Sequence, residues 1–367
     1  MKFSCLQENF KKGLIIVSHI TGKTVNLPIL SNVLIRAQEG KIECITTNLD
    51  IGIKIFIRGK IEEEGEFTVP AQLLNNYIGL LPHERIDVQS DDKNLILSAG
   101  SSQSKIRGEN AGEFPLVPEI EKDCVFEVQL SQFREALSRT IIAAATDETR
   151  PELCGALFSF SDSKLTIAAT DSFRLAECVI PLLSGAASKK CLIPLATLQE
   201  LLRVLAITED EKLSVYVAEN QILFSFDTVE LVSRLLAHQY PDYKQIIPRE
   251  FRTQATLPVQ ECIQTIKAAS LFTKAGINDI ALEVKVQESI LKVSAVNNQL
   301  GENVATLPIQ VRGEDNAVVL NYRFLLDGLQ TLQSETGFLG VMQGTSPAIL
   351  KPEHGEGFLY VIMPIRQ

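Results

Sequence analysis

Three stretches of the chain share one alternation of apolar and polar positions. Each holds two alternating segments around a short polar turn: KIECITTNLDIGIKIFI (41–57), KLTIAATDSFRLAECVIP (164–181) and ILKVSAVNNQLGENVATLPI (290–309). A period of two indicates half-buried strands, and Asn, Asp or Gly at the break indicates a hairpin turn. We therefore predict three β-hairpins of one design.

The segments beside the hairpins repeat as well. Apolar residues at helical spacing precede the hairpins in ENFKKGLIIVSHI (8–20), SQFREALSRTIIAAA (131–145) and QECIQTIKAASLF (260–272). A strand followed by an amphipathic helix is expected after them, in 65–82, 189–206 and 316–333. The order strand, helix, strands thus occurs twice per repeat, so each domain resembles two similar halves.

A repeat of roughly 125 residues matches one domain length. The sequence predicts an α+β fold of three tandem similar domains, each with two helices and antiparallel sheets. Polar stretches at 121–125 and 248–252 place the domains at 1–122, 123–250 and 251–367.

Composition narrows the function classes. The formal net charge of −10 opposes free association with nucleic acid, so any DNA role depends on local basic patches or on topology. We expect no membrane helix, because no apolar run approaches 18 residues, and no signal peptide, because MKFSCLQENFKKG (1–13) lacks a continuous apolar segment. Seven scattered cysteines without a C-x-x-C pair predict a reduced, cytoplasmic protein without zinc.

The polar turn at Thr170, Asp171 and Arg174 raises the question of a hidden hydrolase site. A catalytic site is seldom built three times, whereas turn chemistry recurs with the fold, so Asp171 is interpreted as a turn residue. Arg174 has no counterpart, since Gly52 and Gly301 align with it. The four histidines lack partners at metal-ligand spacing, and glycine-rich nucleotide motifs are missing, so we expect no enzyme, metal or cofactor.

Several stretches, in order along the whole chain, resemble the bacterial DNA polymerase III beta subunit, or sliding clamp, family. They are LPILSNVLI (27–35), DETRPELCG (147–155), ATDSFRLA (169–176), YPDYKQIIP (240–248), SPAILKP (346–352) and VIMPIRQ (361–367). The resemblance implies a ring-shaped head-to-tail homodimer that surrounds duplex DNA without reading its sequence, with helices lining the hole. Its implied partners are the replicative polymerase, the clamp loader and other proteins that carry a clamp-binding peptide.

The resemblance also implies site residues. The peptide cleft between domains two and three would be formed by Leu153, Thr170, Ser172, Arg174, Leu175, Pro241, Ile246, Thr345, Pro347, Val361, Ile362, Met363, Pro364, Ile365 and Arg366. Aliphatic walls and proline rings suit apolar peptide anchors, with the two arginines as donors near the mouth. Ser172, Phe173 and Gln245 depart from the residues usual in the family, so peptide preference is expected to differ.

A second set of residues would face DNA. Seven basic residues lie on the predicted helices: Lys11, Lys12, Arg134, Arg139, Arg203, Lys267 and Arg323. The resemblance adds Lys23, Thr24 and Arg150 in loops, although Thr24, Gln72 and Leu195 stand where well-known members have arginines. The dimer interface would include Ile106, Leu271 and Phe272. The alternative to a ring is a non-encircling repeat scaffold that binds protein peptides only.

Overall fold

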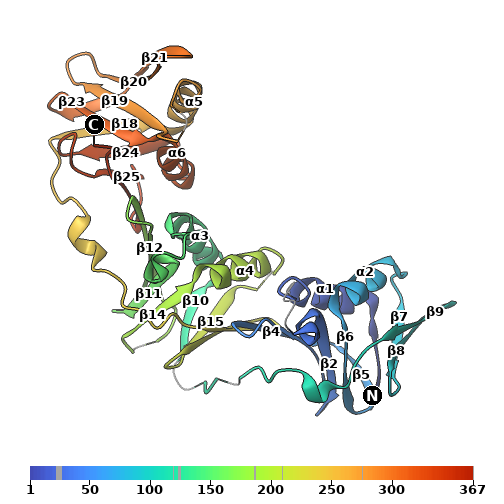
Figure 1. The fold of residues 1–367 in the computed structure, drawn as a ribbon. Helices are drawn as coiled ribbons and strands as arrows, with labels where there is room; N and C mark the ends of the chain where they lie inside the picture. The colour runs from blue at the N-terminus through green and yellow to red at the C-terminus, as the bar shows by residue number, and fades with distance from the viewer. Residues whose placement is uncertain are drawn as a thin grey trace. The chain divides into compact units, whose positions relative to one another are not determined.

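The fold is described from a computed structural model that covers residues 1–367 except 22–26, 119, 123, 124, 186, 209, 275 and 367. The chain forms two compact units, and Figure 1 labels many of their elements. Unit 1 comprises Met1–Ser131, Leu182–Ala187 and Gln199–Leu235, and unit 2 comprises Gln132–Pro181, Ser188–Leu198 and Leu236–Gln367. The domain boundaries near 122 and 250 stay a prediction.

Unit 1 holds two antiparallel sheets. The first has the order β5 (Gly59–Glu63), β1 (Lys2–Leu6), β7 (Arg85–Ser90), β8 (Asn94–Ala99) and β9 (Ser102–Arg107). The second has the order β10 (Val125–Gln129), β15 (Lys212–Val217), β16 (Gln221–Phe226), β17 (Val229–Arg234), β4 (Ile51–Ile57), β3 (Lys41–Thr47), β2 (Asn32–Gln38) and β6 (Gly65–Pro70).

Two helices of unit 1 pack beside each other, α1 (Gln7–Val17) and α2 (Ala71–Leu80). In α1 the buried side chains Phe10, Leu14 and Val17 recur at helical spacing, and the helix contacts β3 and β4. Fully burying each such side chain contributes about 1.5–3 kcal/mol. The predicted helix at 8–20 is therefore confirmed, although it ends earlier than its apolar pattern.

Unit 2 also holds two antiparallel sheets. The larger has the order β14 (Lys189–Pro194), β11 (Gly155–Ser161), β12 (Lys164–Thr170), β13 (Arg174–Pro181), β26 (Phe358–Ile362), β25 (Ala348–Pro352), β24 (Thr336–Val341), β18 (Thr253–Pro258) and β22 (Gln310–Gly313). The smaller has the order β21 (Gly301–Pro308), β20 (Ile290–Asn297), β19 (Asp279–Lys285) and β23 (Asn316–Asn321).

Four more helices follow the predicted plan. They are α3 (Leu130–Thr140), α4 (Leu195–Leu205), α5 (Val259–Ser270) and α6 (Tyr322–Thr331). Short 3-10 turns complete the described chain: η1 (Pro28–Ser31), η2 (Ala111–Glu113), η3 (Ile141–Ala143), η4 (Pro151–Leu153) and η5 (Tyr243–Ile246). The described residues hold no helix long and apolar enough to cross a bilayer.

Two strand pairs join segments that lie far apart in the sequence. In unit 1, β4 pairs with β17, with Ile53 opposite Leu231. In unit 2, β13 pairs with β26, with Ala176 opposite Tyr360. In each pair, strands of two predicted domains lie side by side and form one continuous sheet. Main-chain hydrogen bonds therefore join one predicted domain to part of the next.

Candidate peptide-binding site

The three predicted hairpins are confirmed, and two of their turns have the same detailed construction. In the β12–β13 turn, Asp171 Oδ1 accepts hydrogen bonds from the backbone N–H groups of Phe173 and Arg174, each at 2.9 Å. Thr170 donates through its hydroxyl to the carbonyl of Arg174 at 2.6 Å. The β3–β4 turn repeats both features with Asn48 and Thr47, so Asp171 orders a turn.

The geometry corrects the predicted alignment of Arg174. Asn48 Oδ1 accepts from the backbone N–H of Ile51, three residues on, as Asp171 does from Arg174. Asn297 Oδ1 likewise accepts from the N–H of Leu300 at 3.3 Å. The counterparts of Arg174 are therefore Ile51 and Leu300, and the alignment with Gly52 and Gly301 was one residue out of register.

Arg174 lies at the start of β13 and is held from several sides. Its Nε donates to Asp171 Oδ2 at 2.9 Å, and its Nη1 donates to Asp327 Oδ2 at 2.5 Å. The guanidinium carbon also lies 4.5 Å from the centre of the Phe324 ring. Only 14% of the Arg174 side chain is exposed, so the guanidinium connects the β12–β13 turn to α6.

Burial and charge act in opposite directions on this cluster. Burial acts to lower the pKa of Arg174, but Tyr360, Asp171 and Asp327 together raise that pKa above its ordinary value. Burial raises the pKa of Tyr360, and the neighbouring guanidinium only partly offsets this effect. Arg174 therefore stays charged and Tyr360 stays neutral at physiological pH.

An apolar cluster surrounds the β13–β26 pair. Its buried members are Ala168, Leu175, Tyr243, Ile349 and Val361. Partly buried side chains pack against them: Leu157, Tyr240, Ile246, Ile247, Phe251 and Leu359. We call these eleven residues the unit 2 cluster. Partly buried apolar side chains over a buried floor can accept the apolar anchors of a peptide.

The remaining cleft candidates lie in several segments of unit 2. Leu153 and Ile362 are buried, and Ser172, Pro347, Met363, Pro364 and Ile365 are half-buried. The exposed ones are Pro241, Thr345 and Arg366. Two backbone hydrogen bonds hold the segment after β26, from Met363 N–H to the Phe173 carbonyl and from Ile365 N–H to the Val319 carbonyl, each at 2.8 Å.

Sequence reasoning missed the aromatic part of the cluster. Tyr243 is buried and donates through its hydroxyl to Glu177 Oε2 at 2.5 Å. Burial, followed by this bond to a carboxylate, raises the pKa of Tyr243 above its ordinary range. Tyr240 packs edge-on against it, with ring centres 6.3 Å apart. Both tyrosines lie in YPDYKQIIP, so the signal that could have located them was present.

Comparison with known families settles what this fold is. Models of the DNA polymerase III beta subunit match in order: its N-terminal domain over residues 1–118, its central domain over 127–242 and its C-terminal domain over 244–366. The chain belongs to the DNA polymerase III beta subunit family. The fold is accordingly three beta-clamp domains of mixed helices and antiparallel sheets.

Relatives of the beta subunit match over their whole length. The beta sliding clamp of Synechococcus elongatus is 29% identical, with 100% of this chain and 99% of the relative covered, and that of Bacillus subtilis is 27% identical, with 100% of both covered. The crystal structure of the beta subunit of Thermotoga maritima matches with a TM-score of 0.93 at 27% identity, over 100% of this chain and 99% of that one. This beta subunit is thus a sliding clamp, a non-catalytic processivity factor of DNA replication.

Family membership removes the hydrolase alternative. The clamp family is non-catalytic, and the hydrogen bonds of Asp171 and Arg174 are those of a structural turn. Within the described part of the clamp, no group of three or more His, Cys, Asp or Glu side chains could hold a metal ion.

The basic residues predicted to face DNA differ in exposure and in the groups that they bond. Lys12, Arg134, Arg150, Lys267 and Arg323 are exposed, and Lys11 is half-buried. Lys23 and Thr24 lie outside the described residues. Arg139 and Arg203 bond instead to backbone carbonyl groups of other helices.

The predicted interface residues lie on one edge strand and just after one helix. Ile106 is buried on β9, the edge strand of the five-stranded sheet, while Leu271 is 73% exposed and Phe272 half-buried just after α5. Sequence reasoning missed the apolar residues of the edge strand β21 and its neighbours. Val296, Leu300 and Val304 are exposed by 56%, 63% and 52%.

Proposed function

We propose that this clamp works as a homodimeric ring that encircles duplex DNA in the cytoplasm and binds client proteins through a peptide cleft in unit 2. The observation that carries the cleft is the unit 2 cluster, in which partly buried side chains from several segments surround the buried floor of Leu175 and Val361. A structure of a Bartonella birtlesii sliding clamp bound to griselimycin, 27% identical with a TM-score of 0.92 over the full length of both chains, supports the ability of this fold to bind a ligand.

The proposed clients are the replicative polymerase, the clamp loader and other replication or repair proteins. Each would insert a short segment with leucine and aromatic anchors against Leu157, Ile246 and Met363. Burying one such anchor contributes about 1.5–3 kcal/mol, so two anchors supply about 3–6 kcal/mol, and a micromolar peptide, at about 8 kcal/mol, needs further contacts beside them.

Peptide titration tests the cleft. We expect Met363→Glu to weaken binding of a fluorescent peptide with Leu and Phe anchors at least tenfold, because a carboxylate would have to lose water beside the anchors. The matched control is Leu183→Glu, an exposed apolar position of unit 1. Equal affinities for the two variants would remove the cleft from this site.

The second copy of the chain is the occupant we propose for the apolar edge of the four-stranded sheet. One face of strand β21 is exposed, with Glu302, Val304 and Thr306 at alternate positions, as expected of an edge strand that another surface covers. Its proposed partner is the β9 edge of the other subunit, around Ile106, which gives a head-to-tail contact that closes a ring.

Mass photometry and DNA retention test the ring. We expect a dimer for the wild type, a monomer for Val304→Glu, and longer retention on nicked circular DNA than on linear DNA with free ends. The six basic residues not bonded to another helix, Lys11, Lys12, Arg134, Arg150, Lys267 and Arg323, are proposed to face the phosphates together with Lys23 and Thr24. A persistent monomer with equal retention on both DNA forms would favour the non-encircling scaffold.

A further inference from the structure

Helix α1 ends without a basic residue in its last turn, yet its last four carbonyl groups all have partners. Ser18 donates to the Leu14 carbonyl through its backbone N–H at 2.9 Å and its hydroxyl at 2.6 Å. Thr46 donates to the Val17 carbonyl at 2.7 Å. The two carbonyls between them, of Ile15 and Ile16, are bonded by a side chain from another part of the chain.

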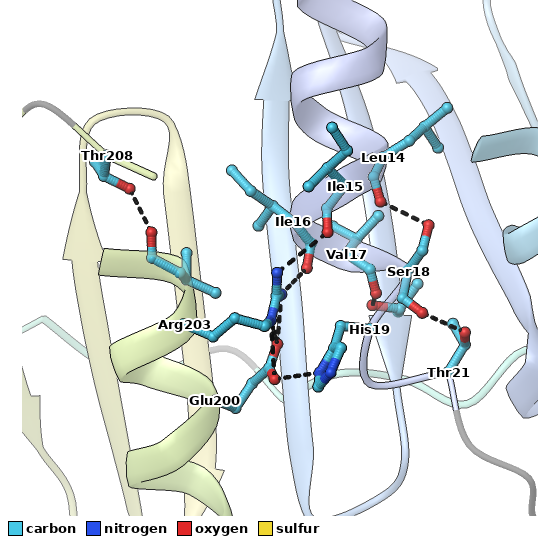
Figure 2. Close-up of polar contacts among 12 residues, drawn as sticks. Leu14, Ile15, Ile16, Val17, Ser18, His19, Thr21, Glu200, Arg203 and Thr208 are labelled. Carbon is cyan, nitrogen blue, oxygen red and sulfur yellow. Dashed lines mark hydrogen bonds and ion pairs between the residues drawn. The ribbon is translucent and has the colours of Figure 1, made fainter. Parts of the chain in front are cut away.

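That side chain is Arg203, on α4 (Figure 2). Its Nη2 donates to the Ile16 carbonyl at 2.6 Å, and its Nη1 donates to the Ile15 carbonyl at 3.3 Å. Glu200, one turn earlier on α4, accepts from Arg203 Nε and Nη2 and is only 5% exposed. His19 Nδ1 lies 2.6 Å from the second Glu200 oxygen.

The same device occurs between α3 and α6 in unit 2. Helix α6 also has no basic residue in its last turn. Arg139 of α3 donates through Nη2 to the carbonyl of Leu332 at 3.5 Å and to Gln333 Oε1 at 3.0 Å. Glu135, one turn earlier, lies 2.8 Å from the same nitrogen, and the Arg139 side chain is 14% exposed.

We propose that Arg203 and Arg139 are positioning residues that fix the angle between neighbouring clamp domains, rather than contacts to DNA. We define the Arg203 clasp as Arg203, Glu200 and the end of α1 that Arg203 bonds. The Arg139 clasp is Arg139, Glu135 and the end of α6 that Arg139 bonds. A cation at a helix C-terminus is favoured by the helix dipole, and two parallel N–H donors also fix direction. The central-domain helices α3 and α4 thus each hold the end of a helix in the adjoining domain.

The clasps matter because each junction already has one attachment. The pair β4–β17 joins the N-terminal and central domains in unit 1, and β13–β26 joins the central and C-terminal domains in unit 2. A strand pair alone permits bending about the ladder. A second attachment through the helices removes that freedom, which would preset the curvature of the ring; this consequence rests on the proposed homodimer.

The Lys substitution separates geometry from charge. Arg203→Lys keeps the positive charge but replaces the planar fork of N–H donors, which bonds two carbonyls and Glu200, by a single ammonium point charge. We expect the dissociation constant of the dimer to rise about tenfold, the equivalent of one charge-assisted hydrogen bond, with affinity for a short linear duplex unchanged. Arg139→Lys should also raise the dissociation constant of the dimer, but by a smaller factor, because the bond from Arg139 to a carbonyl is longer than that from Arg203. Arg58→Lys, at an exposed position of unit 1 outside the proposed contact surfaces, is the matched control.

Small-angle X-ray scattering of the monomeric Val304→Glu variant, with and without Arg203→Lys, measures the distribution of molecular dimensions, which depends on the angle between the domains, and needs neither DNA nor a dimer. We expect the second substitution to broaden the distribution of molecular dimensions, and Glu200→Gln to do so to a smaller extent in a folded protein. An unchanged distribution would overturn the proposal. A second result would also overturn it: Arg203→Lys dimerises as tightly as the wild type, while Arg203→Ala loses its binding to the duplex. If the wild type never dimerises, the ring fails while the scattering result still decides the clasps.

Discussion

Replacing Arg174 by alanine distinguishes a structural connection from a direct peptide contact. The substitution removes two charge-assisted hydrogen bonds, to Asp171 and Asp327, and the contact with the Phe324 ring. We expect the variant to lose stability before it loses any specific peptide interaction.

The size of the expected stability loss follows from how deeply each contact of Arg174 is buried. The bond to Asp171 joins side chains that are 14% and 16% exposed, and we assign it about 2 kcal/mol. Asp327 is 44% exposed, so its bond is discounted for solvent screening to about 1 kcal/mol. The cation–π contact adds about 1 kcal/mol. Arg174→Ala should therefore lower the free energy of unfolding by about 3–4 kcal/mol, and Arg174→Lys by about half as much.

Urea denaturation followed by tyrosine fluorescence suits this measurement. The chain has no tryptophan and six tyrosines, of which Tyr240, Tyr243 and Tyr360 are predominantly buried in unit 2. Asp327→Asn is the matched partner variant, and a double-mutant cycle with Arg174→Ala should give a coupling energy of about 1 kcal/mol. A loss of unfolding free energy below about 1 kcal/mol for Arg174→Ala, together with weaker binding of the peptide, would refute the reasoning. Arg174 would then be a direct donor to the peptide.

Three further predictions concern the interior. Gly328→Ala would place a Cβ atom 2.6 Å from the Tyr360 ring, so we expect about 1–3 kcal/mol of destabilisation in a thermal melt, and an unchanged midpoint would contradict the packing. Burial raises the pKa of Cys178 to about 11 and of Cys191 to about 12, so both should resist iodoacetamide at pH 8, while Cys154, the least buried of these three, reacts faster. Because the folded thiols hold their protons longer than the unfolded ones, stability should fall as pH rises from about 9 towards 12; a flat profile would count against their burial.

The helices and hairpins could be predicted because their signals are local. Apolar spacing located α1 and its repeats, and Asn, Asp or Gly at the break of each alternating stretch located the turns. The alignment of Arg174 with Gly52 failed because hairpin similarity was judged by residue type, whereas the side-chain acceptor at Asn48 or Asp171 fixes the register.

The site could be predicted only in part because its contacts are not local. Asp327 lies 153 positions from Arg174, and nothing in a single amphipathic helix indicates which acidic residue meets a distant arginine. The same holds for Arg203, 187 positions from the Ile16 carbonyl that it bonds. Its position on a helix predicted an exposed basic side chain, whereas the structure uses it to satisfy a helix end.

The strand pair β13–β26 affects whether domains of different clamps can be combined into a hybrid protein. Its hydrogen bonds join backbone groups, which every residue except proline supplies equally, so this ladder demands little of side-chain identity. Arg174 and Asp327, by contrast, must be inherited together. A hybrid clamp cut near residue 250 should therefore assemble with a foreign C-terminal domain when that domain brings an acidic residue at position 327. Compatibility across this junction would then depend on this ion pair and on side chains that fit the unit 2 cluster.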